Sequence, residues 1–140
     1  MIRNYFGSDI AEITKLGSFL HKNYKFKLDV FSKCLVCVLK EKLVGFIVYS
    51  IMYERAEIID IVVDPDYRKR GYGKCLISAA LDEIKNNKCQ NVTLEVSSGN
   101  DVAIKFYSNF GFKKVGEIKN YYFDIESNVF HDAYLMELKF

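Results

Sequence analysis

The sequence predicts an α/β fold built on a mixed sheet, antiparallel at its N-terminal part and parallel at its centre, with helices on both faces. Three observations lead to this prediction. Short apolar runs with the composition of strands recur along the chain, two helical patterns separate strands in its second half, and a segment of glycine and basic residues joins a strand to a helix. Alternation of strand and helix is typical of parallel strands joined by right-handed crossovers.

The N-terminal half is expected to hold one helix and four strands. Asp9, with Glu12 three residues on, predicts a capping box at the start of a helix that ends near Lys22. Its apolar stripe is Ile10, Ile13, Leu16 and Leu20. The expected strands cover residues 2–6, 33–40, 42–53 and 57–63, with a hairpin turn at residues 40–42 and a stop at Asp64-Pro65.

The C-terminal half is expected to alternate helices and strands. A helix over residues 73–87 carries a continuous apolar stripe, and a strand over residues 91–96 follows it. A short helix capped by Asn100 is stopped by Gly111, because an amide side chain suits the first position and glycine the last. Two strands near residues 113–123 and 132–140 close the chain.

Length and composition indicate a single domain over residues 1–140, and half of its residues are apolar. A net charge of +2 lacks the dense positive charge of a nucleic-acid-binding domain. The apolar runs are too short to cross a bilayer, and the N-terminus does not resemble a signal peptide. We therefore expect a cytoplasmic protein with no membrane or nucleic-acid partner; its oligomeric state is left open.

The four cysteines are interpreted as packing residues. Cys34 and Cys37 form a C-x-x-C pair, but residues three apart in a strand point to opposite faces, and no second pair accompanies them. Buried reduced thiols are therefore favoured over a metal site or a disulfide. Cys75 is placed on the core face of a helix and Cys89 near a helix end.

The segment Arg68-Lys-Arg-Gly-Tyr-Gly-Lys74 has the features of an anion site. The amides at the first turn of a helix are unpaired, and the helix dipole adds partial positive charge there. Gly71 and Gly73 would let a pyrophosphate approach the backbone. A basic surface turn is the alternative. The third glycine of a dinucleotide fingerprint and the Gly-Lys-Ser/Thr of a P-loop are both missing.

At this point the chain resembles the GNAT superfamily of acyl-CoA-dependent N-acyltransferases. The signature Arg/Gln-x-x-Gly-x-Gly/Ala is met by Arg68, Gly71 and Gly73. The stretches that begin at Ile61 and Leu94, together with Phe106-Tyr107, Phe110-Gly-Phe and Asn120-Tyr-Tyr, are similar to bacterial ribosomal-protein alanine N-acetyltransferases. The resemblance covers roughly residues 55–140. Residues 23–29 replace the Pro-Trp loop that usually shapes the acceptor pocket.

The resemblance implies acetyl-CoA as cosubstrate, no metal, and a set of binding residues. The backbone of Ile61, Val62 and Val63 would hold the pantetheine arm, and Asn100 and Tyr107 would contact the CoA arm and its sulfur. The pyrophosphate would be held by Arg68, Lys69, Arg70, Gly71, Tyr72, Gly73 and Lys74.

The chemistry needs a base for the amine and an acid for the leaving thiolate. Glu95 lies late in a strand before a crossover helix, where ligand crevices form, and its spacing from Tyr107 matches the related enzymes. We assign Glu95 as the base, acting through water, and Tyr107 as the acid. The alternatives are a solvated strand residue and a core tyrosine.

The acceptor is less well defined than the cosubstrate. Tyr121 and Tyr122 resemble the pair that holds the backbone of a bound peptide, and Glu57 or Asp60 could anchor the substrate. Side chains alternate between the two faces of a strand, and Glu57 and Asp60 are an odd number of residues apart. They are therefore expected to face opposite ways. The favoured acceptor is the N-terminal α-amine of a protein or peptide. A small amine (polyamine, amino acid or aminoglycoside) and a non-catalytic acyl-CoA-binding module are the alternatives.

Overall fold

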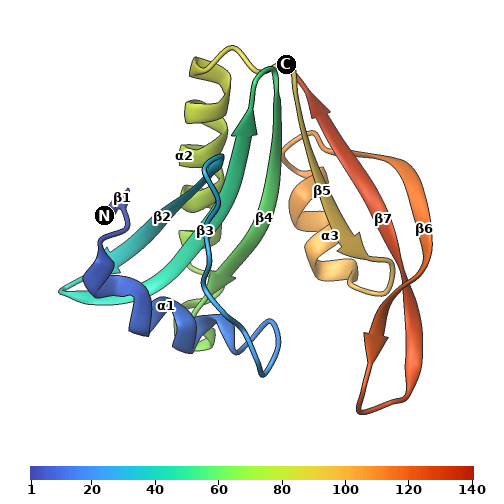
Figure 1. Cartoon of the computed structure of the whole chain (residues 1–140), viewed down its shortest axis with the longest axis horizontal. Coiled ribbons are helices and arrows are strands. Elements are labelled where there is room, and N and C mark those ends of the chain that lie inside the picture. Colours follow the sequence, from blue (N-terminus) through green and yellow to red (C-terminus); the bar gives the residue numbers. More distant parts are fainter. The chain divides into compact units, whose positions relative to one another are not determined.

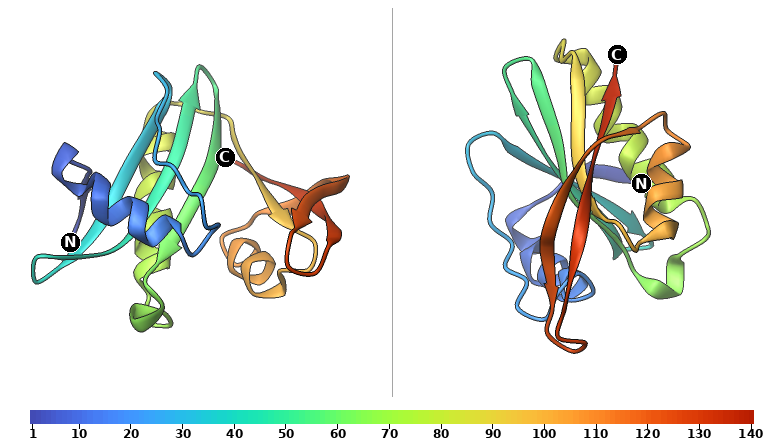
Figure 2. Two further views of the ribbon diagram at one scale, coloured as in Figure 1. Left: turned by 60° about the horizontal axis from the view of Figure 1, so that its bottom comes forward. Right: turned by 90° about the vertical axis from the view of Figure 1, so that its right-hand side faces the viewer.

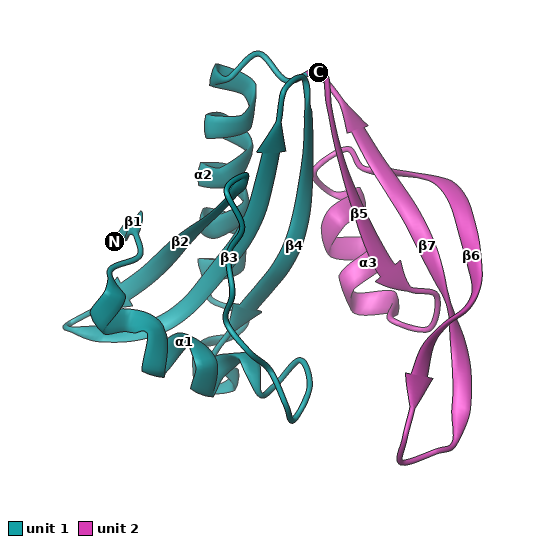
Figure 3. Ribbon diagram, in the orientation of Figure 1, with its two compact units in different colours: residues 1–89 teal, residues 90–140 magenta.

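The computed structural model describes all residues from 1 to 140, which form two compact units. Unit 1 comprises Met1–Cys89 and unit 2 comprises Gln90–Phe140 (Figure 3). Whether the chain behaves as one domain stays a prediction. None of the helices combines the length and the apolar character needed to cross a membrane.

The sheet of unit 1 is antiparallel, as the sequence predicts for the N-terminal part (Figure 1). β2 and β3 form the expected hairpin, and its turn residues Lys40 and Glu41 have φ of 46° and 68°. Two successive left-handed residues match the right-handed twist of the flanking strands. The strands are β1 (Ile2–Asn4), β2 (Ser32–Leu39), β3 (Lys42–Met52) and β4 (Arg55–Val63).

Helices cover both faces of this sheet (Figure 2). On one face α1 (Ile10–Gly17) packs Ile13 and Leu16 against β-strand side chains such as Phe46. The other face is covered by α2 (Tyr72–Asn86), whose buried residues are Leu76, Ile77, Ala80 and Ile84. The apolar stripe predicted for residues 73–87 is therefore the core face of α2, with Leu81 at its half-buried margin.

The first helix is shorter than the sequence predicts. α1 ends at Gly17 rather than near Lys22, and the predicted stripe residues Ile10 and Leu20 are 41% and 45% exposed. After Gly17 the chain tightens into turns, since the Phe19 amide donates to the Leu16 carbonyl and the Leu20 amide to the Gly17 carbonyl. The ring of Tyr24 returns onto Gly17, where any side chain would collide with it. The stripe of four was therefore wrong at both ends.

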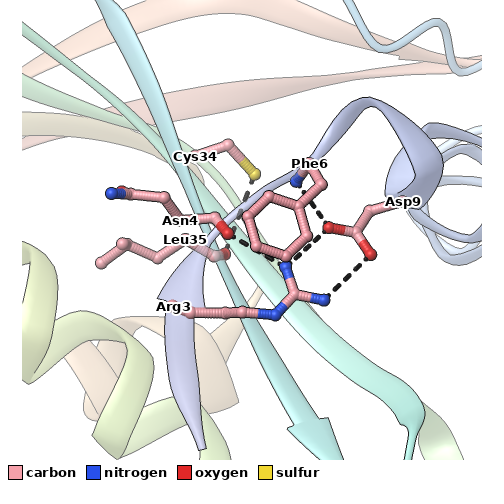
Figure 4. Close-up of polar contacts among 6 residues, drawn as sticks. All are labelled: Arg3, Asn4, Phe6, Asp9, Cys34 and Leu35. Atoms are coloured by element: carbon pink, nitrogen blue, oxygen red, sulfur yellow. Dashed lines mark hydrogen bonds and ion pairs between the residues drawn. The ribbon is translucent and has the colours of Figure 1, made fainter.

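The start of α1 is also built differently from the predicted capping box. The Asp9 side chain makes no cap hydrogen bond to the helix that follows. Its carboxylate accepts hydrogen bonds from the two terminal guanidinium nitrogens of Arg3, at 2.8 and 3.1 Å, and from the Phe6 amide at 2.6 Å (Figure 4). Arg3 also stacks 4.2 Å from the centre of the Phe6 ring. Asp9 thus ties β1 to the helix start.

Cys34, Cys37 and Cys89 are buried free thiols, as predicted. Cys34 lies in the apolar cluster with α1. Cys37 faces the other side of the sheet, towards α2: burial raises its pKa, and Cys75 of α2 adds to the increase. Cys75 itself is exposed, which contradicts its predicted place on the core face of the helix. Its neighbours Leu76 and Ile77 fill that face instead.

Unit 2 is a three-stranded antiparallel arrangement with one helix. β7 (Val129–Lys139) pairs with β5 (Asn91–Ser97) on one side and with β6 (Lys113–Asp124) on the other. α3 (Asp101–Ser108) follows β5 and contributes the buried Tyr107. Gly111, with φ of 99°, lies in the connection from α3 to β6, where the sequence predicted the stop. β7 begins three residues earlier than the predicted start at residue 132.

Candidate active site

The predicted pyrophosphate segment connects β4 to α2 through a single 3-10 turn over Pro65–Tyr67. Gly71 is the N-cap of α2 and has φ of 90°, a conformation that glycine adopts without strain. The Cys75 amide donates to the Gly71 carbonyl at 3.0 Å and closes the first turn. The amides before it, Tyr72 to Lys74, therefore have no acceptor within the helix, and anion binding at this end of the helix stays a prediction.

The basic residues of this segment are exposed, and two of them are held by neighbours. Arg68 Nε donates to the Val63 carbonyl at 2.9 Å, which fixes the loop to the end of β4. The Arg70 guanidinium lies 5.3 Å from the centre of the Tyr67 ring. The charge at the start of α2 therefore suits an anion such as a pyrophosphate.

A bulge in β4 changes which of its side chains share a face. Val48 of β3 pairs with Asp60, but its neighbour Tyr49 pairs with Ile58, so that Ile59 is an additional residue. Because cross-strand partners share a face, Asp60 lies with Val48, and Glu57 lies with Ser50 on that same face. The prediction that Glu57 and Asp60 face opposite ways was therefore wrong.

Beyond the bulge, the residues expected to hold pantetheine continue β4. Ile61, Val62 and Val63 pair with Ile47, Phe46 and Gly45. A β-carbon at Gly45 would lie 2.9 Å from the Val62 carbonyl oxygen. Gly45 therefore allows β3 to approach this part of β4 closely. The sequence analysis did not single out Gly45, and a glycine inside an apolar strand was the available signal.

Asp60 has a partner that the sequence analysis missed. The Tyr24 hydroxyl donates to Asp60 Oδ2 at 3.1 Å, and the Tyr24 side chain is 9% exposed. Burial raises the pKa of Asp60, although the hydrogen bond from Tyr24 and the charge of His21 oppose the shift. Tyr24 comes from the segment over residues 23–29, which has no regular secondary structure and no periodic pattern of apolar residues that could have predicted this contact.

In unit 2, the charge of Glu95 reaches one of the predicted substrate tyrosines. Glu95 is half-buried on β5, on the face opposite the buried Leu94 and Val96. The pKa of Tyr122 is raised by burial and, to a lesser degree, by the charge of Glu95. The sequence assigned these two residues separately to catalysis and to substrate binding, and in the structure they interact electrostatically.

Tyr121 and Tyr122 form a packed pair because β6 is irregular at this point. The register between β6 and β7 shifts between Ile118 and Tyr122, and Asn120 has φ of 50°. The Asn120 amide donates to Asp132 Oδ1 at 2.9 Å, which holds the irregularity in place. The two tyrosine rings lie 4.9 Å apart, edge to face, and Tyr121 is 46% exposed.

Tyr107 and Asn100 lie on the helix that follows β5. Tyr107 is 9% exposed, and its ring packs edge to face on Phe112 at 5.9 Å. Asn100 caps α3, since its side-chain oxygen accepts from the Ala103 amide at 3.1 Å. Asn100 thereby fixes the first turn of the helix that carries Tyr107, as the sequence predicted, while its contact with the CoA arm stays a prediction.

A model of the acetyltransferase (GNAT) family matches residues 6–112. The chain belongs to the GNAT family of acetyltransferases. It is 31% identical over 97 residues to the ribosomal protein bS18-alanine N-acetyltransferase of Escherichia coli K12, in an alignment that spans 69% of this chain and 64% of that enzyme. It is 29% identical over 155 residues to an N-alpha-acetyltransferase of Saccharolobus solfataricus, spanning 96% of this chain and 90% of the relative.

Solved structures extend the likeness to the whole chain. The crystal structure of the ribosomal-protein-S18-alanine N-acetyltransferase from Escherichia coli superposes with a TM-score of 0.88 at 22% identity, covering 99% of this chain and 92% of that one. The GNAT fold class that the sequence predicts, a mixed α/β fold, is thereby confirmed. Membership of the GNAT family rests on the match over residues 6–112, whereas the alignment with the bS18-alanine N-acetyltransferase spans less than two thirds of that enzyme.

Proposed function

We propose that this GNAT enzyme transfers the acetyl group of acetyl-CoA to the N-terminal α-amine of a protein or peptide. The observation that carries the proposal is the alignment with the N-alpha-acetyltransferase of Saccharolobus solfataricus, which spans nearly all of both chains. The first relatives, by contrast, are matched over less than two thirds of their length. The proposal therefore names an N-terminal α-amine as the acceptor group, and a ribosomal protein is one example of a protein that could carry it.

The residues of unit 1 would bind the cosubstrate. The amides and basic side chains of Arg68–Lys74 suit the negative charge of a pyrophosphate, and the exposed start of α2 supplies amides without intrahelical partners. The backbone of Ile61–Val63 would hydrogen-bond the pantetheine arm as a neighbouring strand does. The thioester supplies an activated acetyl group.

The residues of unit 2 would accept and donate the protons of the reaction. The amine nitrogen forms a bond to the acetyl carbon while the carbon–sulfur bond breaks. Glu95 receives the amine proton through water, and Tyr107 gives its proton to the departing thiolate. A phenol with an ordinary pKa of about 10 is well matched to a thiolate of similar basicity.

An α-amine suits this limited machinery better than a lysine side chain does. The unperturbed pKa of an α-amine is about 7.7–8.0, against about 10.4 for lysine, so a much larger share of α-amines is neutral at pH 7. Tyr121 and Tyr122 would contact the backbone of the first acceptor residues. Their packed pair places one exposed aromatic ring beside another that lies close to Glu95.

The proposal is tested by mass spectrometry of peptides incubated with the enzyme and acetyl-CoA. The panel holds peptides that begin with Ala, Ser or Met, and matched peptides whose N-terminus is blocked and whose internal lysine is free. We expect acetylation of free α-amines alone. Glu95→Gln and Tyr107→Phe should each lower kcat by about 10²–10⁴-fold, the range for general acid or base catalysis. Acetylation of small amines with no product from the peptides would contradict the proposal.

A further inference from the structure

Asp60 differs from the other shielded acids of unit 1 in having no basic partner. Each of the others forms an ion pair with a lysine or arginine of the same unit: Asp9 with Arg3, Glu83 with Lys33 and Asp64 with Lys42. Asp60 has the hydroxyl of Tyr24, which is neutral. Its negative charge is therefore the one in this group that no lysine or arginine offsets.

The two oxygens of Asp60 have different surroundings. Oδ2 accepts the hydrogen bond from Tyr24, while Oδ1 has no hydrogen-bond partner within the chain. Every buried side-chain oxygen in the structure is hydrogen-bonded, so Oδ1 reaches the molecular surface. One oxygen is thus held in place and the other is presented outward.

Tyr24 itself is fixed from several sides. Its ring lies against Gly17, in a space that a β-carbon at that position would fill, and 6.0 Å from the centre of the Phe46 ring. The His21 ring lies 5.6 Å from it on a further side. A rigid donor of this kind holds the carboxylate in one orientation, as binding sites require.

The charges around Asp60 leave a need for a cation. His21 favours the ionised form of Asp60 when protonated. The Cys34 thiol is nearby, and its pKa is raised to about 12 by burial and by the charges of Asp9 and Asp60, so it stays neutral. The groups that lie against Asp60 therefore include a phenol and a neutral thiol. A half-buried carboxylate without a lysine or arginine partner gains most from a cationic ligand.

We propose that Asp60 Oδ1 binds the ammonium form of the acceptor amine and that Tyr24 is the positioning residue that orients it. This inference rests on the proposed function and names a binding residue for its acceptor. The bulge at Ile59 is the structural cause, because it places Asp60 on the face that carries Tyr24, directly before the residues expected to hold pantetheine.

The role is one of binding rather than of accelerating the chemical step. A carboxylate attracts the ammonium ion more strongly than the neutral amine, so its interaction is strongest in the ground state and weakens as the proton leaves. Such an interaction lowers KM without raising kcat. Loss of Asp60 should therefore raise KM for the acceptor and leave kcat unchanged or slightly higher.

The test compares Asp60→Asn with the wild-type enzyme in steady-state kinetics, using an alanine-initiated hexapeptide and 1,4-diaminobutane as separate acceptors. Asparagine keeps an oxygen for Tyr24 and removes the charge. We expect KM for the acceptor to rise about tenfold or more, the usual value of a hydrogen bond to a charged group, with KM for acetyl-CoA unchanged. Tyr24→Phe should give a smaller rise with the same kcat. Asp82→Asn, which removes an exposed charge from α2, should match the wild type.

A binding measurement separates this inference from the proposed function. The side-chain carboxyl carbon of Asp60, assigned in ¹³C NMR by its loss in Asp60→Asn, is followed during titration with ethylammonium chloride and with the hexapeptide. We expect its signal to move with both, and not with the N-acetylated hexapeptide. A signal that stays in place with both amines, or a KM within twofold of wild type, overturns the inference. Activity on the diamine but not on the peptide overturns the α-amine assignment and leaves Asp60 as the amine-binding residue.

Discussion

The ring of Tyr24 lies so close to the backbone of Gly17 that a β-carbon on Gly17 would be 2.1 Å from Tyr24 Cδ2. The end of α1 and the orientation of Tyr24 therefore depend on each other. Because Tyr24 holds Asp60, the glycine at the end of a helix influences a residue on β4.

Gly17→Ala should destabilise the protein by about 1–3 kcal/mol, because the ring must leave its site or the helix end must shift. Gly7→Ala is the matched control, since a β-carbon at Gly7 would meet nothing within 4 Å. Urea denaturation of the two variants gives the comparison. Equal midpoints for Gly17→Ala and wild type would show that Tyr24 moves without penalty.

The ion pair of Asp9 with Arg3 should make stability depend on pH. The pKa of Asp9 is lowered by the hydrogen bond from Arg3, against the effect of burial, and also by the Phe6 amide and the charge of Arg3. A lowered native pKa contributes stability that is present above the unfolded value of about 3.9 and is lost as pH falls through the native value.

Asp9→Asn should accordingly be less stable than wild type at pH 7, and the difference should shrink as the pH falls below about 4. Denaturation midpoints across this range measure it, with the exposed Asp82→Asn as the control variant. A difference that is the same at pH 7 and at pH 3 would mean that Asp9 acts through packing rather than through its charge.

Gly71→Ala should weaken acetyl-CoA binding. Gly71 has φ of 90° at the N-cap of α2, and an alanine there is strained by about 1–2 kcal/mol although the space around it is open. The start of the helix should then rearrange, so that KM for acetyl-CoA rises several-fold. The KM for the acceptor serves as the internal control, because Gly71 contributes nothing to the proposed amine site. An unchanged KM for acetyl-CoA would remove this turn from the cosubstrate site.

The proximity of Glu95 and Tyr122 can be measured by titration. The pKa of Tyr122 is raised first by burial and then by Glu95, so Glu95→Gln should move its titration to lower pH without restoring the ordinary value. Ultraviolet absorbance of the tyrosinates follows the change, and Tyr122→Phe identifies which transition belongs to Tyr122. The exposed Glu126→Gln is the control. No movement in Glu95→Gln would place the two side chains too far apart for the proposed site.

Asp60 should reduce stability at neutral pH. Burial raises its native pKa, so its contribution to stability is fully present below the unfolded value of about 3.9 and is lost as pH rises through the native value. Asp60→Asn should therefore be at least as stable as wild type at pH 7, with an advantage that disappears in acid. Thermal unfolding at the two pH values measures this. A less stable variant at pH 7 would assign Asp60 a structural role.

The sequence predicted elements better than it predicted their ends and irregularities. Period and composition were sufficient for α2, for the β2–β3 hairpin and for the loop at Gly71. The prediction that Ile10 and Leu20 are buried was wrong because helical spacing does not reveal where a helix begins or ends. Tyr24, which packs against Gly17 at this helix end, returns from a segment without periodicity.

The candidate site was predicted where its residues belong to a local motif. Gly71 and the residues around it are contiguous, and so are Tyr121 and Tyr122. The Asp60–Tyr24 pair joins residues far apart in the chain and depends on an extra residue at Ile59, which cannot be told from the adjacent Ile58 by composition. Strict alternation along a strand was the rule that failed.

The bulge at Ile59 makes the facing of residues on β4 depend on the length of the strand. Without one of the two adjacent isoleucines, regular pairing would keep Asp60 opposite Val48 and an isoleucine opposite Tyr49, so both halves of the strand would keep their faces. A one-residue deletion elsewhere in β4 has no such solution, because the residues beyond it would turn to the opposite face. Loss of one of these isoleucines should therefore be tolerated better than loss of any other residue of β4.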